Sequence, residues 1–231
     1  MKALVPVFLI AFCFSCQTDN GENATSTLTG KEKLLCDSIR FDQAILTDIR
    51  SFTSAPVEAF HYSLSKSIDS SGNETELDPI YMPGLVFEET EVNTERILEE
   101  LHDRLKTKGY YLFVLERNYG MANQKDMMAI LKTTDQFEVL EHIETNGINY
   151  GIETDSLVKI MREFDKKYRF DLIGANGEWC EFIIKGENVD WKELAEEAYR
   201  VCPDIVDQGV GSMEDLITSM QQTKRLYFWW D

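Results

Sequence analysis

The chain is short of basic residues, proline and glycine. Its 231 residues include 23 Lys and Arg against 41 Asp and Glu, which gives a formal net charge of −18. Nucleic acid is therefore excluded as the expected partner, because phosphate backbones bind surfaces rich in Lys and Arg. With only 5 Pro and 13 Gly, the chain is not a collagen-like or low-complexity polymer either.

Apolar residues are plentiful enough for a packed core. They make up 43% of the chain and aromatic residues make up 11%, which excludes a disordered protein. The length favours one domain. Helical and strand patterns are mixed without regular strand–helix alternation. We therefore predict a single α+β domain with a mixed, mainly antiparallel sheet packed by several helices.

The first sixteen residues resemble a bacterial lipoprotein signal. Lys2 precedes an uncharged apolar run over 3–14, which is too short to cross a bilayer. Ser15-Cys16 ends the run, so we predict a signal at 1–15 and lipidation at Cys16, although Cys13 stands where most such signals carry an aliphatic residue. The alternatives are an ordinary cleaved export signal and a buried apolar N-terminus. Cleavage would remove one basic and no acidic residue, so charge would not hold the mature chain on an anionic membrane.

A polar tether and a folded body follow. We predict that residues 16–30 contain the lipid anchor and a flexible tether. Residues 31–109 are expected to form an N-terminal elaboration packed on the domain, and residues 110–231 are expected to form the α+β domain. The spacing of apolar residues predicts helices over 31–52 and 93–106, and helices capped by Asp135, Asp155, Asp190 and Ser212. It predicts strands over 80–87, broken at Pro83-Gly84, and over 110–115 and 127–131, a hairpin of 170–173 with 179–184, and a final strand at 226–230.

Four stretches in the C-terminal half resemble one family. They are Thr145-Asn-Gly-Ile-Asn-Tyr150, the glycine-centred hairpin over 174–179, Cys202-Pro-Asp-Ile-Val-Asp-Gln-Gly-Val-Gly211 and Leu226-Tyr-Phe-Trp-Trp-Asp231. With these motifs, the chain over about 110–231 resembles the bacterial family called domain of unknown function 4253. The resemblance implies a bacterial α+β domain and assigns no activity to any residue.

The same stretches supply the candidate binding residues. Carboxylate and amide oxygens suit hard cations, but too few lie together in the predicted loop over 204–208, so we expect no metal and no cofactor. Trp229 and Trp230 are consecutive on a predicted strand and point to opposite faces, so one can be core and the other exposed to a partner. The candidate set is Asn146, Asn149, Tyr150, Trp179, Asp204, Asp207, Gln208, Trp229 and Trp230.

The sequence contains no recognisable catalytic pattern. Its three histidines, His61, His102 and His142, are far apart and lack a partner at metal-ligand spacing. Cys180 and Cys202 either pair or remain buried thiols.

We expect a lipid-anchored protein of the bacterial cell envelope, on the periplasmic or outer-membrane face. Its expected role is non-enzymatic binding of a protein or another envelope component. One alternative is a hydrolase-type enzyme using Asp204, Asp207 and Gln208 with Asn146 and Asn149. Another is an immunity-type protein that binds a basic toxin.

Overall fold

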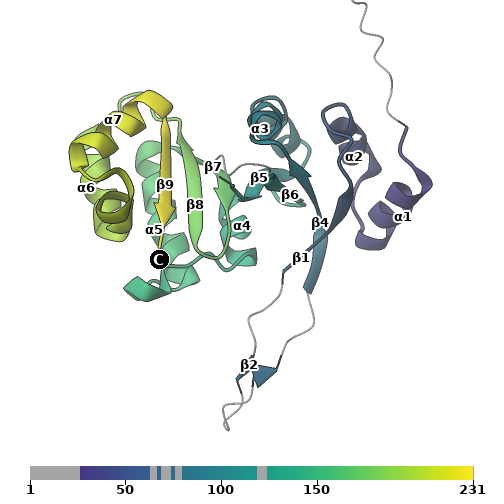
Figure 1. The fold of residues 1–231 in the computed structure, drawn as a ribbon, viewed down its shortest axis with the longest axis horizontal. Helices are drawn as coiled ribbons and strands as arrows, with labels where there is room; N and C mark the ends of the chain where they lie inside the picture. The colour runs from purple at the N-terminus through teal and green to yellow at the C-terminus, as the bar shows by residue number, and fades with distance from the viewer. Residues whose placement is uncertain (1–26, 63–66, 69–73, 76–79, 119–123, 231) are drawn as a thin grey trace, which may run out of the picture.

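A twisted sheet forms the centre of the molecule (Figure 1). The computed structural model describes residues 27–62, 67–68, 74–75, 80–118 and 124–230. In these residues a seven-stranded sheet has the order β1-β4-β6-β5-β7-β8-β9, and β2 pairs separately with β3. The strands are β1 (Val57–Tyr62), β2 (Ser67–Ile68), β3 (Glu74–Thr75), β4 (Ile80–Glu89), β5 (Tyr111–Glu116), β6 (Asp126–Leu131), β7 (Phe170–Ala175), β8 (Trp179–Ile184) and β9 (Arg225–Trp229). Neighbours in the large sheet are antiparallel except β5 and β7, which confirms the predicted class.

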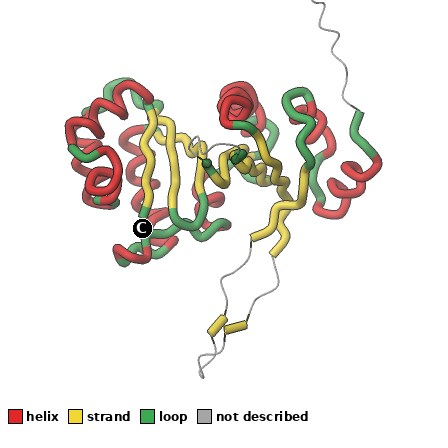
Figure 2. Tube along the Cα trace, viewed as in Figure 1, coloured by secondary structure: helices red, strands yellow, loops and turns green. Residues whose placement is uncertain are grey.

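Helices cover both faces of this sheet (Figure 2). On one face lie α1 (Gly30–Ile39), α2 (Gln43–Arg50) and α3 (Glu91–Lys106), whose apolar residues form one core cluster with β4, β5 and β6. On the other lie α4 (Gln136–His142), α5 (Thr154–Tyr168), α6 (Trp191–Val201) and α7 (Met213–Thr223), whose apolar residues form a second cluster with β7, β8 and β9. None of the described helices is both long and apolar enough to span a membrane.

The helix predicted over 31–52 is in fact two helices. Arg40 adopts a left-handed conformation (φ 57°) after α1, and the Asp42 side chain then caps α2. A residue in this conformation ends a helix. The spacing of apolar residues continues across this point, so the spacing alone does not reveal the break.

The predicted tether ends earlier than expected. Leu28 is buried in the core, and Thr29 forms a capping box with Glu32 at the start of α1. The folded body therefore begins before residue 31. Cys16 and residues 17–26 of the predicted tether lie outside the described residues.

Strand β4 runs through Pro83-Gly84 without the predicted break. The register between β4 and β1 shifts between Ala59 and His61. Pro83 lies opposite this irregular stretch, so its missing N–H removes no hydrogen bond from a regular β-ladder. Gly84 allows close approach to β6, since a Cβ added there would lie 2.7 Å from the carbonyl oxygen of Ile130.

The C-terminal half confirms most predicted elements, including the β7–β8 hairpin and the final strand, β9. Helix α5 is preceded by Glu153 rather than by the predicted cap Asp155, which lies inside its first turn. Two short helices, η1 (Ile148–Tyr150) and η2 (Ile205–Val210), complete the fold.

The predicted loop over 204–208 is wrong, because η2 is a π-helix. The Gly211 N–H donates to the Val206 carbonyl at 2.9 Å, five residues back, and Gly211 (φ 87°) ends the turn. Cys180 and Cys202, whose pairing the sequence left open, are buried free thiols.

Candidate functional site

A groove of about 560 Å³ lies between α3 and α7. Its floor comes from β8 and β9, which stand between these helices in the view of Figure 1. The volume is in the range of clefts that bind small molecules or short peptide segments. The groove is lined by Glu91, Glu95, Arg117, Asp126, Glu181, Ile205, Gly209, Val210, Leu216, Ser219, Met220, Thr223, Arg225, Leu226, Tyr227 and Trp229.

Four charged residues form a closed network inside the groove. Arg117 donates to Glu95 Oε1 from Nη1 at 2.7 Å and to Glu181 Oε2 from Nε at 2.9 Å. Arg225 also bridges both carboxylates: its Nη1 donates at 3.3 Å to Glu95 and 3.4 Å to Glu181, and its Nη2 donates to Glu95. The network therefore joins α3, the segment after β5, β8 and β9.

Two polar atoms beside this network lack partners among the described residues. They are Nη2 of Arg117 and Oδ2 of Asp126, and both are buried. The Arg117 side chain is 8% exposed, and Asp126 is 2% exposed. A buried polar group without a hydrogen bond costs about 1–3 kcal/mol. Both residues line the groove, and the two atoms lie beneath its surface.

The network keeps Glu95 and Arg117 charged. Burial raises the pKa of Glu95, but hydrogen bonds from Arg225 and Arg117 outweigh this effect and lower that pKa. Burial likewise disfavours the charged form of Arg117, yet the nearby Glu181 and Glu95 raise the pKa of its guanidinium. The groove therefore presents fixed charges at neutral pH.

An aromatic wall borders the charged floor. Tyr227 and Trp229 line the groove and are partly buried. Trp179 stacks on Tyr227, with ring centroids 5.4 Å apart, and is itself buried. The sequence prediction that Trp229 and Trp230 face opposite ways is confirmed, since Trp230 is buried in the core of the other face.

The remaining candidate residues do not line this groove. Tyr150 donates to Asp204 Oδ1 at 2.6 Å, and Gln208 Nε2 donates to the same oxygen at 2.8 Å. The hydrogen bond to Asp204 raises the pKa of Tyr150 to about 12. These contacts tie the segment containing η1 to η2, whose Ile205, Gly209 and Val210 line the groove. This part of the motif positions one wall.

The other amide and acidic candidates also make local contacts. Asn146 donates to the Glu144 carbonyl at 2.8 Å and accepts the Ile148 N–H at 3.1 Å. Asp207 accepts from the Tyr199 hydroxyl at 3.2 and 3.3 Å. Asn149 is exposed.

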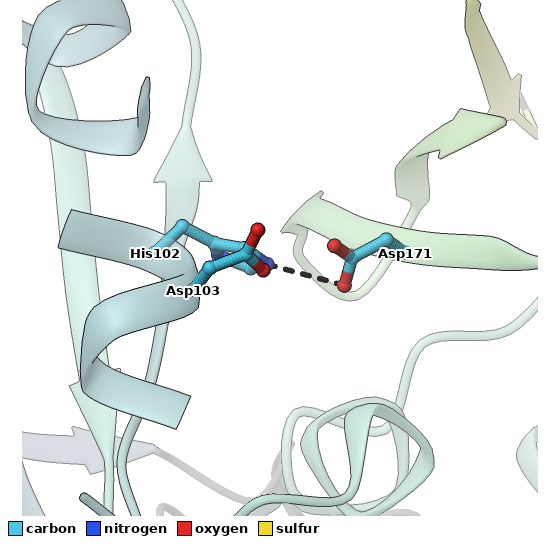
Figure 3. A group of neighbouring side chains, drawn as sticks. All are labelled: His102, Asp103 and Asp171. Carbon is cyan, nitrogen blue, oxygen red and sulfur yellow. Dashed lines mark hydrogen bonds and ion pairs between the residues drawn. The ribbon is translucent and has the colours of Figure 1, made fainter. Parts of the chain in front are cut away.

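A second polar cluster lies between α3 and β7 (Figure 3). His102, Asp103 and Asp171 have ligand atoms within 4.8 Å of one another, the spacing of a candidate metal centre. However, His102 Nδ1 lies 2.7 Å from the Leu112 carbonyl oxygen and Nε2 lies 3.2 Å from Asp171 Oδ1. Both ring nitrogens therefore face acceptors, and neither points a lone pair toward an ion.

Ammonium groups complete this second cluster. Lys106 Nζ lies 2.7 Å from Asp171 Oδ1, and Lys185 Nζ contacts Oδ2. Burial raises the pKa of Asp171, but hydrogen bonds and charges from His102 and the two lysines outweigh it and hold that pKa far below its usual range. The arrangement is a buried ion-pair cluster that joins α3 to β7.

One segment of the chain matches a known family model, and this segment contributes part of the groove. Residues 127–231 match the family model "Domain of unknown function (DUF4253)". The resemblance predicted over 110–231 is thus confirmed over a shorter segment. The DUF4253 segment supplies Glu181, Arg225 and η2, whereas Glu95 and Arg117 precede it. No curated protein and no solved structure matches the chain.

Sequence reasoning missed the charged residues of both clusters. Glu181 and Asp171 each stand in a strand of large apolar neighbours, and a charge in such a strand signals a buried partner. That signal was available in the sequence. The partners Glu95 and Arg117 carry no comparable signal, because a helix face and a segment after a strand are normally charged.

Proposed function

We propose that the chain is a non-enzymatic binding module of the bacterial cell envelope and that the groove between α3 and α7 is its binding site. One observation carries the proposal: Arg117 Nη2 and Asp126 Oδ2 are buried without partners and line the same groove. Native proteins seldom leave such atoms unsatisfied. An occupant that bonds to both explains why this chain keeps them.

The chemistry of the reactive side chains favours binding over catalysis. Burial raises the pKa of Cys202 to about 11 and raises the pKa values of Cys180 and Cys36, whereas a nucleophilic cysteine needs a lowered pKa. His102 is engaged at both ring nitrogens. Asp204, the centre of the hydrolase alternative, is 3% exposed and bound to Tyr150.

Lipid at Cys16 would hold this module at a membrane. The support comes from sequence: an apolar run over 3–14, then Ser15-Cys16, then polar residues. Two or more acyl chains give stable anchoring. We expect Cys16→Ser to move the protein from the membrane fraction to the soluble fraction, and unchanged fractionation would contradict the anchor.

Site-specific photo-crosslinking tests the binding role. A photoreactive amino acid replaces Ser219, which lines the groove on α7, in the full-length chain in cells. The matched control replaces Glu163, an exposed residue of α5 outside that groove. We expect a discrete adduct from position 219 that is absent from position 163. Identical adduct patterns at the two positions would overturn the proposal.

A further inference from the structure

We propose that the groove takes a basic peptide segment. In this arrangement a Lys or Arg side chain of the ligand pairs with Asp126, and a neighbouring main-chain carbonyl accepts a hydrogen bond from Arg117 Nη2. The inference rests on the proposed function and names the chemistry of its ligand.

The carboxylate of Asp126 calls for a cation. Its Oδ1 accepts the Asn118 N–H at 3.0 Å, and its buried Oδ2 has no hydrogen-bond partner among the described residues. Arg117 lies close enough to interact with Asp126 through its charge, but its Nη1 and Nε donate to Glu95 and Glu181, and its Nη2 makes no hydrogen bond to Asp126. A buried carboxylate is stabilised by a cationic donor far more than by a neutral one.

Arg117 Nη2 needs a hydrogen-bond acceptor, and the negative charge around it favours a neutral acceptor over a carboxylate. The groove lining includes the acids Glu91, Glu95, Asp126 and Glu181 against Arg117 and Arg225. A ligand carboxylate beside Arg117 would lie among these acids and be repelled. A peptide carbonyl satisfies the same N–H without adding negative charge, so a peptide fits better than a free amino acid.

The aromatic wall of the groove and the net charge of the chain both favour a basic peptide. Tyr227 and Trp229 line the groove, and aromatic side chains suit the aliphatic stem and the cation of Lys or Arg. The chain carries a formal net charge of −18, so a cationic segment is attracted from a distance.

Calorimetric titration of the full-length protein in detergent tests the inference. The probe is the blocked tripeptide acetyl-Gly-Arg-Gly-amide, compared with its citrulline analogue, which keeps the shape and loses the charge. We expect the arginine peptide to bind about tenfold or more tightly than the citrulline peptide. This comparison uses the wild-type protein and does not depend on a variant that folds.

Three variants assign the two contacts. Asp126→Asn keeps the size and the acceptor for Asn118, and we expect it to abolish the preference for arginine over citrulline. Arg117→Lys removes Nη2, and we expect it to weaken both peptides by a similar factor. Glu163→Gln removes one exposed acid outside the groove and should change neither affinity.

Equal affinity for the two peptides, no binding of either, or a preserved arginine preference in Asp126→Asn would each overturn the inference. The proposed function fails separately, because it is judged by crosslinking at position 219. A position-specific adduct with a ligand that lacks basic residues would leave the binding module standing and remove the basic peptide.

Discussion

Replacing Asp171 by Asn removes the carboxylate that contacts both lysines and the histidine of the buried cluster. In the wild type it meets His102, Lys106 and Lys185, and it accepts from the Tyr111 hydroxyl at 3.1 Å. Asparagine has nearly the same volume, so the change deletes charge without opening a cavity. Two ammonium groups then lose their shared counter-charge, and the His102 ring loses a carboxylate partner.

The size of the effect follows from the exposure of those groups. Removing one partner of a buried ion pair costs about 3–5 kcal/mol. The Lys106 and Lys185 side chains are 25% and 39% exposed and can turn toward water, whereas His102 is 6% exposed and cannot. We therefore expect a loss near the lower end, about 3 kcal/mol. In urea this corresponds to a midpoint lower by about 1 M.

Urea unfolding followed by circular dichroism measures this loss at pH 7 and at pH 3. Because the folded pKa of Asp171 is depressed, its contribution is complete above the unfolded value of about 3.9 and declines as the pH falls below it. The gap between wild type and Asp171→Asn should narrow by about 1 kcal/mol at pH 3.

The matched control is Asp103→Asn, because Asp103 pairs with the same lysines but is 73% exposed. It should stay within about 0.5 kcal/mol of the wild type. A loss below about 1 kcal/mol for Asp171→Asn, or a gap that does not change between pH 7 and pH 3, would refute the reasoning.

Further predictions concern β4, the thiols and the motif. Gly84→Ala should destabilise the fold by about 1–3 kcal/mol in urea unfolding, because its Cβ would meet the backbone of Ile130, and an unchanged midpoint would contradict this packing. Cys202, with a pKa of about 11, should react with a thiol reagent at pH 8 only on unfolding, so rapid labelling of the native protein would contradict its burial. Tyr150 should ionise near pH 12. In an ultraviolet titration, the phenolate step near pH 12 should therefore be smaller in Tyr150→Phe than in the wild type. If the variant instead loses a step near pH 10, the hydrogen bond to Asp204 is absent.

The sequence predicts the helices and strands better than the breaks and connections between them. The helix at α3 and the hairpin of β7 with β8 follow from apolar spacing and turn residues, which are local properties. The break at Arg40 and the π-helix after Asp204 do not, because each depends on a backbone conformation chosen by tertiary packing. Pro83 misleads for a similar reason, since the β1 register shift that accommodates it is a property of the neighbouring strand.

The candidate site shows the same division. Trp229 is found because strand alternation places it opposite Trp230, and it does line the groove. Glu95 and Arg225 are 130 residues apart in sequence, and no local pattern links them. The sequence identifies the motif around Asp204, but it does not show that the bonds of Asp204 to Tyr150 and Gln208 position η2, because Tyr150 is distant in the sequence.

The single parallel pair between β5 and β7 has a consequence for folding kinetics. It joins two antiparallel ribbons, β1-β4-β6-β5 and β7-β8-β9, and it brings together segments about sixty residues apart, as the register of Val114 with Gly174 shows. Within the ribbons the longest-range pair is Trp179 with Trp229, fifty positions apart, so the seam joins the most distant segments and we expect it to close late. The groove takes Arg117 from one ribbon and Glu181 from the other, so an occupant bridges the seam and should slow unfolding more than it speeds folding.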